Sequence, residues 1–353
     1  MNITKATDRY EAWLSRHLRI LQPDLDFKHQ QMRLAPFPFL RATYYRWAEI
    51  WAGVCGSVAR APRVLAVGDL HIENFGTWRD IEGRLIWGIN DFDEAFHLPY
   101  TNDLVRLATS ALLADITCEP RAGIAALLAG YTAAFSAGGK AFVLAEHHPA
   151  LRQMASARLH DPEAYWAKLH SLPESSDPTP AGAIKAIDRM MPERRLHWKI
   201  SHRVAGLGSL GRERYVAVAD WHGGSVAREA KALAPSACVW ADKGKGSAPI
   251  LYQEILNRSI RCRDPFVRLQ KSWIVRRLAP DCSRIEISAL PKERDEIRLL
   301  HAMGWETANV HLGTAKPRTI LDDLKKRPRN WLFEAARKME KSVAADFKDY
   351  STR

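Results

Sequence analysis

Two short apolar runs that each end in a cluster of carboxylates constrain this chain most strongly. Residues 64–67 (VLAV) lead into GDLHIEN, and residues 84–89 (RLIWGI) lead into NDFDE. Branched and aromatic side chains favour strands, and the polar, glycine-containing stretch 80–83 predicts a turn. We therefore expect a β-hairpin or two paired short strands, with three polar side chains close together at the strand ends: Asp69, Asn74 and Asp91.

This clustering has a chemical use. Carboxylate and amide oxygens are hard ligands that suit Mg²⁺, and an aspartate that is not a ligand can accept a proton from a hydroxyl nucleophile. Kinases place a catalytic Asp five residues before a metal-binding Asn, with a further Asp on the next strand. Asp69, Asn74 and Asp91 have this order and spacing. The alternative interpretation is two Asp-rich turns that cap strands and bind nothing.

Composition narrows the class of protein but not its partner. The 353 residues allow one large or two modest domains, and the net charge of +12 favours anionic partners such as nucleotides, nucleic acid or acidic membranes. Five widely separated cysteines without C-x-x-C spacing predict reduced thiols and a cytoplasmic location. The N-terminus lacks the apolar core of a signal peptide, and no apolar run reaches about 18 residues, so we expect no membrane span.

The pattern along the chain predicts helices first and strands later, an α+β fold. We expect a helical lobe carrying the catalytic and metal-binding loops over 1–170, a Pro- and Ser-rich linker over 171–182, a β-rich lobe over 183–290, and C-terminal helices over 291–353. Helices are expected at 4–21, after 41, from 101, and at 120–136, 140–157, 160–170, 250–256, 292–312 and 330–350. Strands are expected at 196–204, 214–219, 225–231, 272–278 and 284–287.

A glycine-rich stretch, GLGSLG at 206–211, lies between two of the predicted strands. The dinucleotide-binding fingerprint requires a helix after its glycines, so a following strand disfavours a Rossmann fold. A glycine-rich hairpin over nucleotide phosphates fits better, because glycines let backbone amides approach anionic oxygens closely. The candidate phosphate-binding residues are Gly206, Gly208 and Gly211, and a plain tight turn is the alternative.

Lys231 lies on the third strand of this predicted sheet. In kinases a strand lysine holds the α- and β-phosphates and pairs with a helix glutamate. Glu254, on a predicted helix, is the candidate partner, and Glu229 is a weaker one. The alternative is a solvated strand lysine. Asp103 stands at the start of a predicted helix, where it would cap the first turn.

The motifs GDLHIENFG and INDFDEA resemble those of aminoglycoside phosphotransferases and related small-molecule kinases. The chain also resembles an uncharacterised bacterial family known as domain of unknown function 2252, which combines these motifs with a later GxGSxGxR…K segment. The resemblance implies a protein-kinase-like, two-lobed fold that uses ATP and Mg²⁺.

Carried over residue by residue, the resemblance assigns a role to each matching position. Asp69 would be the catalytic base, and Asp103 would brace the catalytic loop. The remaining roles are Mg²⁺ ligands for Asn74 and Asp91 with Asp93 as an auxiliary, a phosphate loop for Gly206, Gly208 and Gly211, and a lysine–glutamate pair for Lys231 and Glu254.

Two features depart from the phosphotransferase pattern. Val67 stands where these enzymes usually carry histidine. The catalytic segment also precedes the glycine loop and lysine, whereas kinases have the reverse order. We therefore expect a circularly permuted chain, in which the same groups converge despite the changed order.

The expected function is an ATP- and Mg²⁺-dependent phosphotransferase acting on a hydroxyl group of a small molecule. Nucleotidyl (AMP) transfer, with ATP bound in the reverse direction, and a non-catalytic nucleotide-binding pseudokinase are the alternatives. A nucleic-acid partner is disfavoured, because the chain has no helix-turn-helix, zinc-finger or aromatic–basic single-strand motif. His71, Glu73 and Asp93 line the predicted cleft and are candidates for contact with the acceptor.

Overall fold

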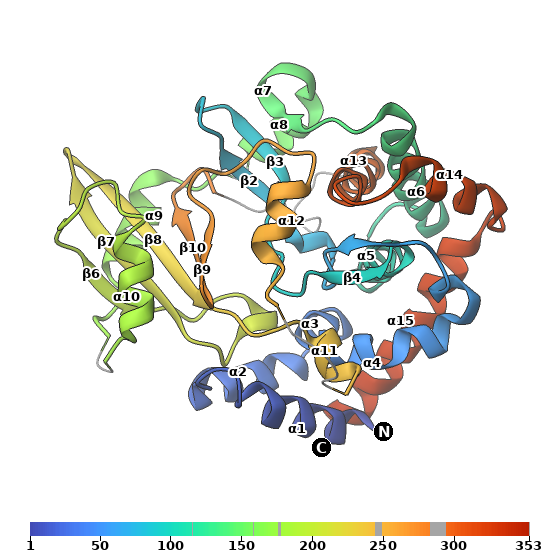
Figure 1. Ribbon diagram of the computed structural model, residues 1–353, viewed down its shortest axis with the longest axis horizontal. Coiled ribbons are helices and arrows are strands. Elements are labelled where there is room, and N and C mark those ends of the chain that lie inside the picture. Colours follow the sequence, from blue (N-terminus) through green and yellow to red (C-terminus); the bar gives the residue numbers. More distant parts are fainter. Residues whose placement is uncertain (115, 158, 176–177, 244–248, 283–293, 353) are drawn as a thin grey trace.

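The protein has an α+β fold with three antiparallel sheets, in which the largest sheet and the long helices lie at opposite sides of the molecule (Figure 1). The computed structural model describes residues 1–114, 116–157, 159–175, 178–243, 249–282 and 294–352. The α+β class predicted from the sequence is confirmed. No helix in these ranges is long and apolar enough to span a membrane.

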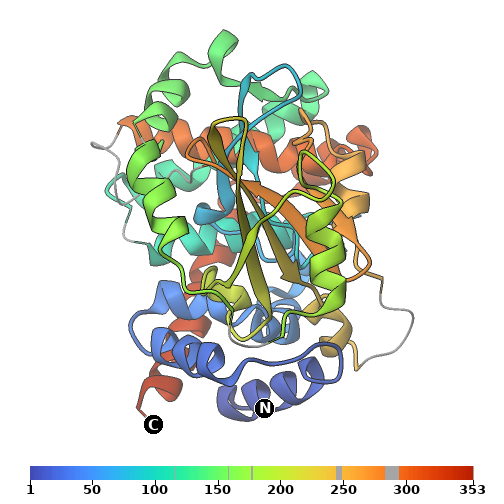
Figure 2. The same cartoon turned by 90° about the vertical axis from the view of Figure 1, so that its left-hand side faces the viewer.

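The largest sheet lies at one side of the molecule and has the strand order β6-β7-β8-β10-β9 (Figure 2). Its buried residues form separate apolar clusters on its two faces, because side chains alternate along each strand. Helix α10 (Ala181–Asp188) covers one face through Ala183 and Ile187, and α9 (Pro162–His170) packs Leu169 against the other. The strands are β6 (Lys199–His202), β7 (Arg214–Trp221), β8 (Gly224–Ala232), β9 (Arg268–Gln270) and β10 (Trp273–Leu278).

Four of the predicted strands correspond to β6, β7, β8 and β10. Strand β9 was not predicted from the sequence, and the strand expected at 284–287 lies outside the described residues. The three-residue β9 is too short to show the period-2 alternation on which a sequence prediction depends.

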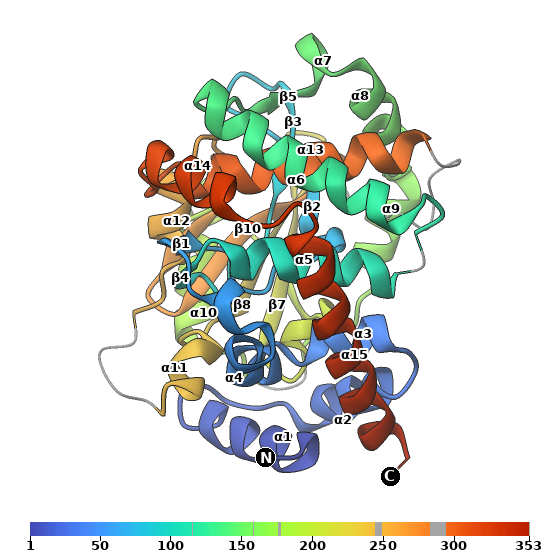
Figure 3. The same ribbon diagram turned by 90° about the vertical axis from the view of Figure 1, so that its right-hand side faces the viewer.

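Long helices form the other side of the molecule (Figure 3). Helix α5 is buried along almost its whole length, and α6 packs along α13. These four central helices are α5 (Thr101–Leu113), α6 (Pro120–Ala137), α13 (Arg294–His311) and α15 (Trp331–Ser351). The shorter helices are α1 (Ile3–Leu14), α2 (Gln22–Met32), α3 (Pro36–Ala42), α4 (Tyr44–Cys55), α7 (Leu144–His147), α8 (Pro149–Ser156), α11 (Ala237–Ala241), α12 (Tyr252–Arg258) and α14 (Pro317–Lys326).

Two predicted helices have different bounds in the structure. The helix expected at 4–21 ends at Leu14, and α2 follows in a stretch for which no helix was predicted. The helix expected at 140–157 is divided into β5 (Phe142–Val143), α7 and α8. Pro149 begins α8, because proline lacks an amide hydrogen and is tolerated in a first helical turn but not in a helix interior.

The pairing predicted for the two apolar runs is wrong. Strand β1 (Arg63–Ala66) pairs with β4 (Phe96–Pro99), whereas β3 (Leu85–Ile89) pairs with β2 (Phe75–Arg79). The turn at 80–83 does join a hairpin, but its first strand is the adjacent FGTWR segment rather than VLAV. A short loop costs the least closure entropy, which favours this local partner.

Candidate functional site

Both carboxylate motifs connect the same two small sheets. Residues 67–74 run from β1 to β2, and residues 90–95 run back from β3 to β4. The register places Phe75 opposite Ile89 and Ala66 opposite Phe96, so the two connections lie side by side. At their crossing, a Cβ on Gly68 would lie only 2.3 Å from the Glu94 carbonyl oxygen, and Gly68 has a φ of +82°. Only glycine permits this approach.

The two connections and the glycine-rich loop enclose a small pocket of about 50 Å³, here called the carboxylate pocket. Segments distant in the sequence therefore meet at one place, as the sequence analysis expected of the two motifs. Its walls are Arg41, Val67, Asp69, His71, Asn74, Asp91, Asp93, Glu94, Gly206, Leu207, Gly208, Ser209 and Arg212.

Asp69 is held in this pocket by Arg106 of α5. Arg106 Nε donates to Asp69 Oδ1 over 2.8 Å, and its Nη2 donates to the same oxygen. The fully buried guanidinium lies 4.9 Å from the ring centroids of both Tyr44 and Trp47. Burial raises the pKa of Asp69 above its ordinary value, although Arg106 opposes this shift. The arginine thus fixes the orientation of the carboxylate while the pocket makes it more basic.

Asp103 supports the backbone that leads to Asp69. Its two carboxylate oxygens accept hydrogen bonds from the amides of Val67 (2.7 Å) and Gly68 (3.0 Å). His311 Nε2 lies 3.0 Å from Asp103 Oδ2. The N-cap of α5 is Tyr100, without a side-chain capping bond. Asp103 therefore binds the backbone at Val67 and Gly68 rather than capping its own helix.

Asn74 closes the turn that follows Asp69. Its Oδ1 accepts a hydrogen bond of 2.7 Å from the His71 amide, and the side chain is buried. A carbonyl oxygen has two lone pairs, so this bond leaves one for another partner. Asn74 is therefore oriented within the pocket wall and retains an acceptor site.

Lys231 reaches from β8 to the second motif. Its Nζ lies 2.6 Å from Asp93 Oδ2 and 3.4 Å from Asp91 Oδ1. The other oxygen of Asp93, Oδ1, is buried without a hydrogen-bond partner among the described residues. Burial and the neighbouring Asp91 raise the pKa of Asp93 to about 6. The pocket therefore holds an acceptor oxygen that its own residues do not satisfy.

The lysine–glutamate pair predicted from the sequence does not form. Glu254 lies 3.0 Å from Arg258 of its own helix α12, and Lys231 instead contacts the two aspartates. The weaker candidate, Glu229, is also wrong, because three arginines surround its fully buried carboxylate. Although burial would raise it, these arginines hold the pKa of Glu229 well below its usual range. They are Arg203, Arg214 (2.8 Å) and Arg276 (2.8 Å).

Two of the three predicted glycines line the carboxylate pocket. A Cβ on Gly208 would lie 3.0 Å from the Arg41 carbonyl oxygen and 3.6 Å from Asp69 Oδ2, so the loop packs closely over the motif. Gly211 lies at the far end of the loop, where its carbonyl accepts from the Leu21 amide at 2.8 Å.

Lys28 of α2 anchors the same loop, a contact that the sequence did not suggest. Lys28 Nζ donates to the Gly208 carbonyl at 3.4 Å, and burial lowers the pKa of Lys28 to about 8.

Two arginines that contact carboxylates of the pocket were not predicted from the sequence. Arg106 follows Asp103 by three residues on a largely buried helix, so it lies on the same helix face. Arg212 Nη2 lies 3.3 Å from Glu94 Oε1, and burial raises the pKa of Glu94 to about 7 despite this contact. A lone arginine in an apolar helix and an arginine directly after the glycine loop were the available signals.

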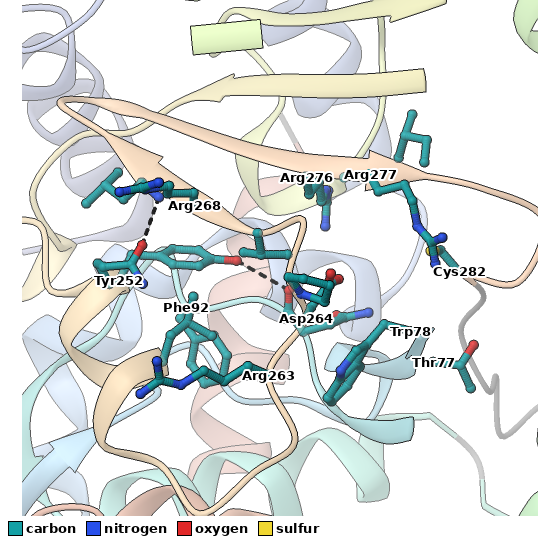
Figure 4. A pocket seen from close by; sticks show the side chains of 18 of the residues that line it. Thr77, Trp78, Phe92, Tyr252, Arg263, Asp264, Arg268, Arg276, Arg277 and Cys282 are labelled. Atoms are coloured by element: carbon teal, nitrogen blue, oxygen red, sulfur yellow. Dashed lines mark hydrogen bonds between the residues drawn. The ribbon is translucent and has the colours of Figure 1, made fainter. Parts of the chain in front are cut away.

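A larger cavity of about 890 Å³ adjoins the carboxylate pocket, and Gly206 lines both (Figure 4). We call it the arginine cavity. It lies between β10, α12, the loop after α12 and the second motif, and the Tyr252 hydroxyl donates to the Asn90 carbonyl across it at 3.4 Å. Its seven arginines are Arg203, Arg214, Arg261, Arg263, Arg268, Arg276 and Arg277.

The donor set fits a magnesium ion with few protein ligands. The described residues contain no group of three or more His, Cys, Asp or Glu side chains arranged to hold a metal. Mg²⁺, however, usually keeps several waters and binds one or two carboxylates together with substrate phosphates. Asp91, the unsatisfied Oδ1 of Asp93 and the amide oxygen of Asn74 supply such a set.

Comparison with known proteins identifies one similarity. A family model described as uncharacterized proteins conserved in bacteria (DUF2252) matches residues 21–158, less than half of the 353-residue chain. This stretch contains both carboxylate motifs and Asp103 but neither the glycine loop nor Lys231. No curated protein and no solved structure matches the chain. Residues 21–158 are therefore similar to that bacterial family.

Proposed function

We propose that this protein is a kinase-like, ATP- and Mg²⁺-dependent transferase that moves a phosphorus-containing group to a hydroxyl of a small-molecule acceptor. The observation that carries the proposal is the shared pocket of Asp69, Asn74, Asp91 and the loop at Gly206 and Gly208. Turns that merely cap strands would have no reason to converge with a glycine loop from the opposite half of the chain.

The proposal includes a circular permutation of the kinase order. The helical part would come first, the sheet would follow the 171–182 linker, and the last helices would return to the helical part. The two termini lie at the surface near each other, where residues of α1 and α15 line one shallow depression (Figure 1). Adjacent surface termini are the condition under which a permuted chain keeps its fold.

Each residue of the pocket has a role in this proposal. Asp69 accepts the proton of the acceptor hydroxyl, because burial makes its carboxylate more basic and Arg106 fixes its orientation. Asn74, Asp91 and Asp93 would hold Mg²⁺, which offsets phosphate charge when bound. Lys231 leaves Asp93 for a phosphate oxygen when nucleotide binds, since the two anions compete for one cation.

Replacing Asp69 tests the proposal. We expect Asp69→Asn to abolish transfer from ATP to a panel of hydroxyl compounds while ATP affinity stays within about threefold, because the variant loses the proton acceptor but keeps the pocket's shape. Undiminished transfer by this variant would remove Asp69 from the mechanism.

A non-catalytic nucleotide-binding protein is the second candidate. The contact between Lys231 and Asp93 favours it, because that ion pair closes the metal site in this conformation. ATP binding by the wild-type protein without any turnover would support this candidate.

A further inference from the structure

The arginine cavity contains buried hydrogen-bond donors that its own residues do not satisfy. Arg261 Nη2 donates to the Ile89 carbonyl at 2.8 Å, but Arg261 Nε and Nη1 are buried without a hydrogen-bond partner in the described part of the chain. The same holds for Nε and Nη2 of Arg277, whose nearest carboxylate, Asp281, is 3.5 Å away. Leaving such donors unpaired is costly, so the cavity is built to receive acceptor atoms.

The charge around the cavity is strongly unbalanced. Seven arginines line the cavity, but only one carboxylate, that of Asp264, belongs to its wall. Two further carboxylates, those of Glu229 and Asp281, lie outside the wall and form ion pairs with some of these arginines. Burial lowers the pKa of the Arg261 guanidinium, which is the effect expected for a cation without a full counter-charge. Guanidinium groups bind phosphate oxygens through two parallel hydrogen bonds. The cavity therefore suits a ligand with several phosphate oxygens.

The neighbouring carboxylate pocket has no comparable excess of positive charge. Asp69, Asp91, Asp93 and Glu94 line it together with Arg41 and Arg212, and Arg106 and Lys231 pair with Asp69 and Asp93. A nucleotide bound with its base in the arginine cavity would place a neutral ring among seven cations and its polyanionic tail beside four carboxylates whose charge is already matched by cations. A nucleotide bound in the opposite direction places most of its phosphate charge beside the arginines. It places one phosphate beside the carboxylates, where a single Mg²⁺ can offset the negative charge of that phosphate.

We infer that the arginine cavity receives the β- and γ-phosphates of ATP, so that the α-phosphate reaches the carboxylate pocket and AMP is the transferred group. This inference rests on the proposed function. The acceptor oxygen forms a bond to the α-phosphorus, and its proton passes to Asp69. The bond between the α-phosphorus and the bridging oxygen breaks, and the electron pair leaves with pyrophosphate.

Calorimetric titration with the phosphate tail alone tests this direction. Wild-type protein and two variants, Arg277→Gln and Arg261→Gln, are titrated with tripolyphosphate and with ATP, both with Mg²⁺. We expect each variant to weaken both ligands by about tenfold or more, the equivalent of one lost charge-assisted hydrogen bond. The matched control is Arg318→Gln, because the Arg318 side chain is 95% exposed on α14 outside the cavity wall. It should bind both ligands as wild type does.

The outcomes separate the inference from the proposed function. If tripolyphosphate fails to bind, or binds the cavity variants as tightly as wild type while ATP binds wild type, the inference is overturned and the proposed function stands. If tripolyphosphate binds but ATP does not, the proposed function fails.

Should both buried variants misfold, the variants Arg263→Gln and Arg268→Gln take their place, because these two arginines of the same wall are exposed. An acceptor that carries AMP, with pyrophosphate as the second product, supports the inference, and a phosphorylated acceptor with ADP contradicts it.

Discussion

Lys231 Nζ lies 2.6 Å from Asp93 Oδ2, which joins the large sheet to the second carboxylate motif from the other half of the chain. The lysine is buried, and the side chain of Asp93, which it neutralises, is only 10% exposed. The contact ties a cation proposed to bind phosphate to a carboxylate proposed to bind metal. In the proposal, nucleotide phosphate therefore competes with Asp93 for Lys231, and Mg²⁺ competes with Lys231 for Asp93.

This relationship predicts the response of a Lys231→Met variant to magnesium. Removing one partner of a buried ion pair leaves an uncompensated charge, so the variant should lose about 3 kcal/mol of unfolding free energy. Mg²⁺ without nucleotide should then raise its melting temperature more than that of wild type, because the ion replaces the lost cation. Differential scanning fluorimetry measures both effects. Lys325→Met, on exposed α14, is the control, and an equal magnesium response in all three proteins would argue against a shared metal site.

A second prediction concerns the brace at Asp103. Asp103→Asn leaves one oxygen to accept from the amides of Val67 and Gly68, so at least one buried amide loses its partner. We expect a loss of about 2 kcal/mol in unfolding free energy, measured by urea denaturation. Asp322→Asn, half exposed on α14, should change stability by less than about 0.5 kcal/mol. Equal stability of both variants would show that Asp103 does not support the segment.

The two glutamates once considered as partners of Lys231 should behave very differently. Glu229→Gln leaves three arginines around a neutral group, so we expect a loss of about 3 kcal/mol or more. Glu254→Gln removes only a half-exposed pair with Arg258 and should cost less than about 0.5 kcal/mol. Chemical denaturation measures both, and a larger loss in Glu254→Gln would restore Glu254 as a structural partner.

Buried Glu306 predicts a pH dependence of stability. Burial raises the pKa of Glu306 to about 7 from an ordinary value near 4.5, so the folded state prefers the protonated form. Its contribution is complete below about pH 4.5 and is lost as the pH rises to 7 and above. The unfolding free energy of wild type, relative to Glu306→Gln, should therefore fall by up to about 3 kcal/mol between pH 4.5 and 8. Denaturation at both pH values checks this, and a difference independent of pH would contradict it.

Local patterns predicted much of the fold. Periodicity predicted α6, α15 and four strands of the large sheet, because these elements are long enough to show their own period. The hairpin partner of β3 was predicted wrongly, since the prediction paired it with VLAV and not with the adjacent FGTWR segment. Pairing depends on which segment lies within reach, and apolar content alone does not decide it.

The site was only partly predictable for a similar reason. Asp69, Asn74, Asp91 and Asp93 are contiguous enough to form motifs, and they do line one pocket. The seven arginines of the neighbouring cavity are spread from Arg203 to Arg277 and form no local pattern. Glu254 had a nearer partner four residues away on its own helix, and this local ion pair prevails over the distant one.

The most direct test of the account is a titration of the wild-type protein and Asp91→Ala with ATP, with and without Mg²⁺, followed by thermal shift. A ligand that binds only the folded state raises the melting temperature by mass action. The account predicts a rise for wild type that requires Mg²⁺ and is absent in Asp91→Ala, while an Asp322→Ala control behaves as wild type. No rise in wild type at millimolar ATP would contradict the nucleotide site.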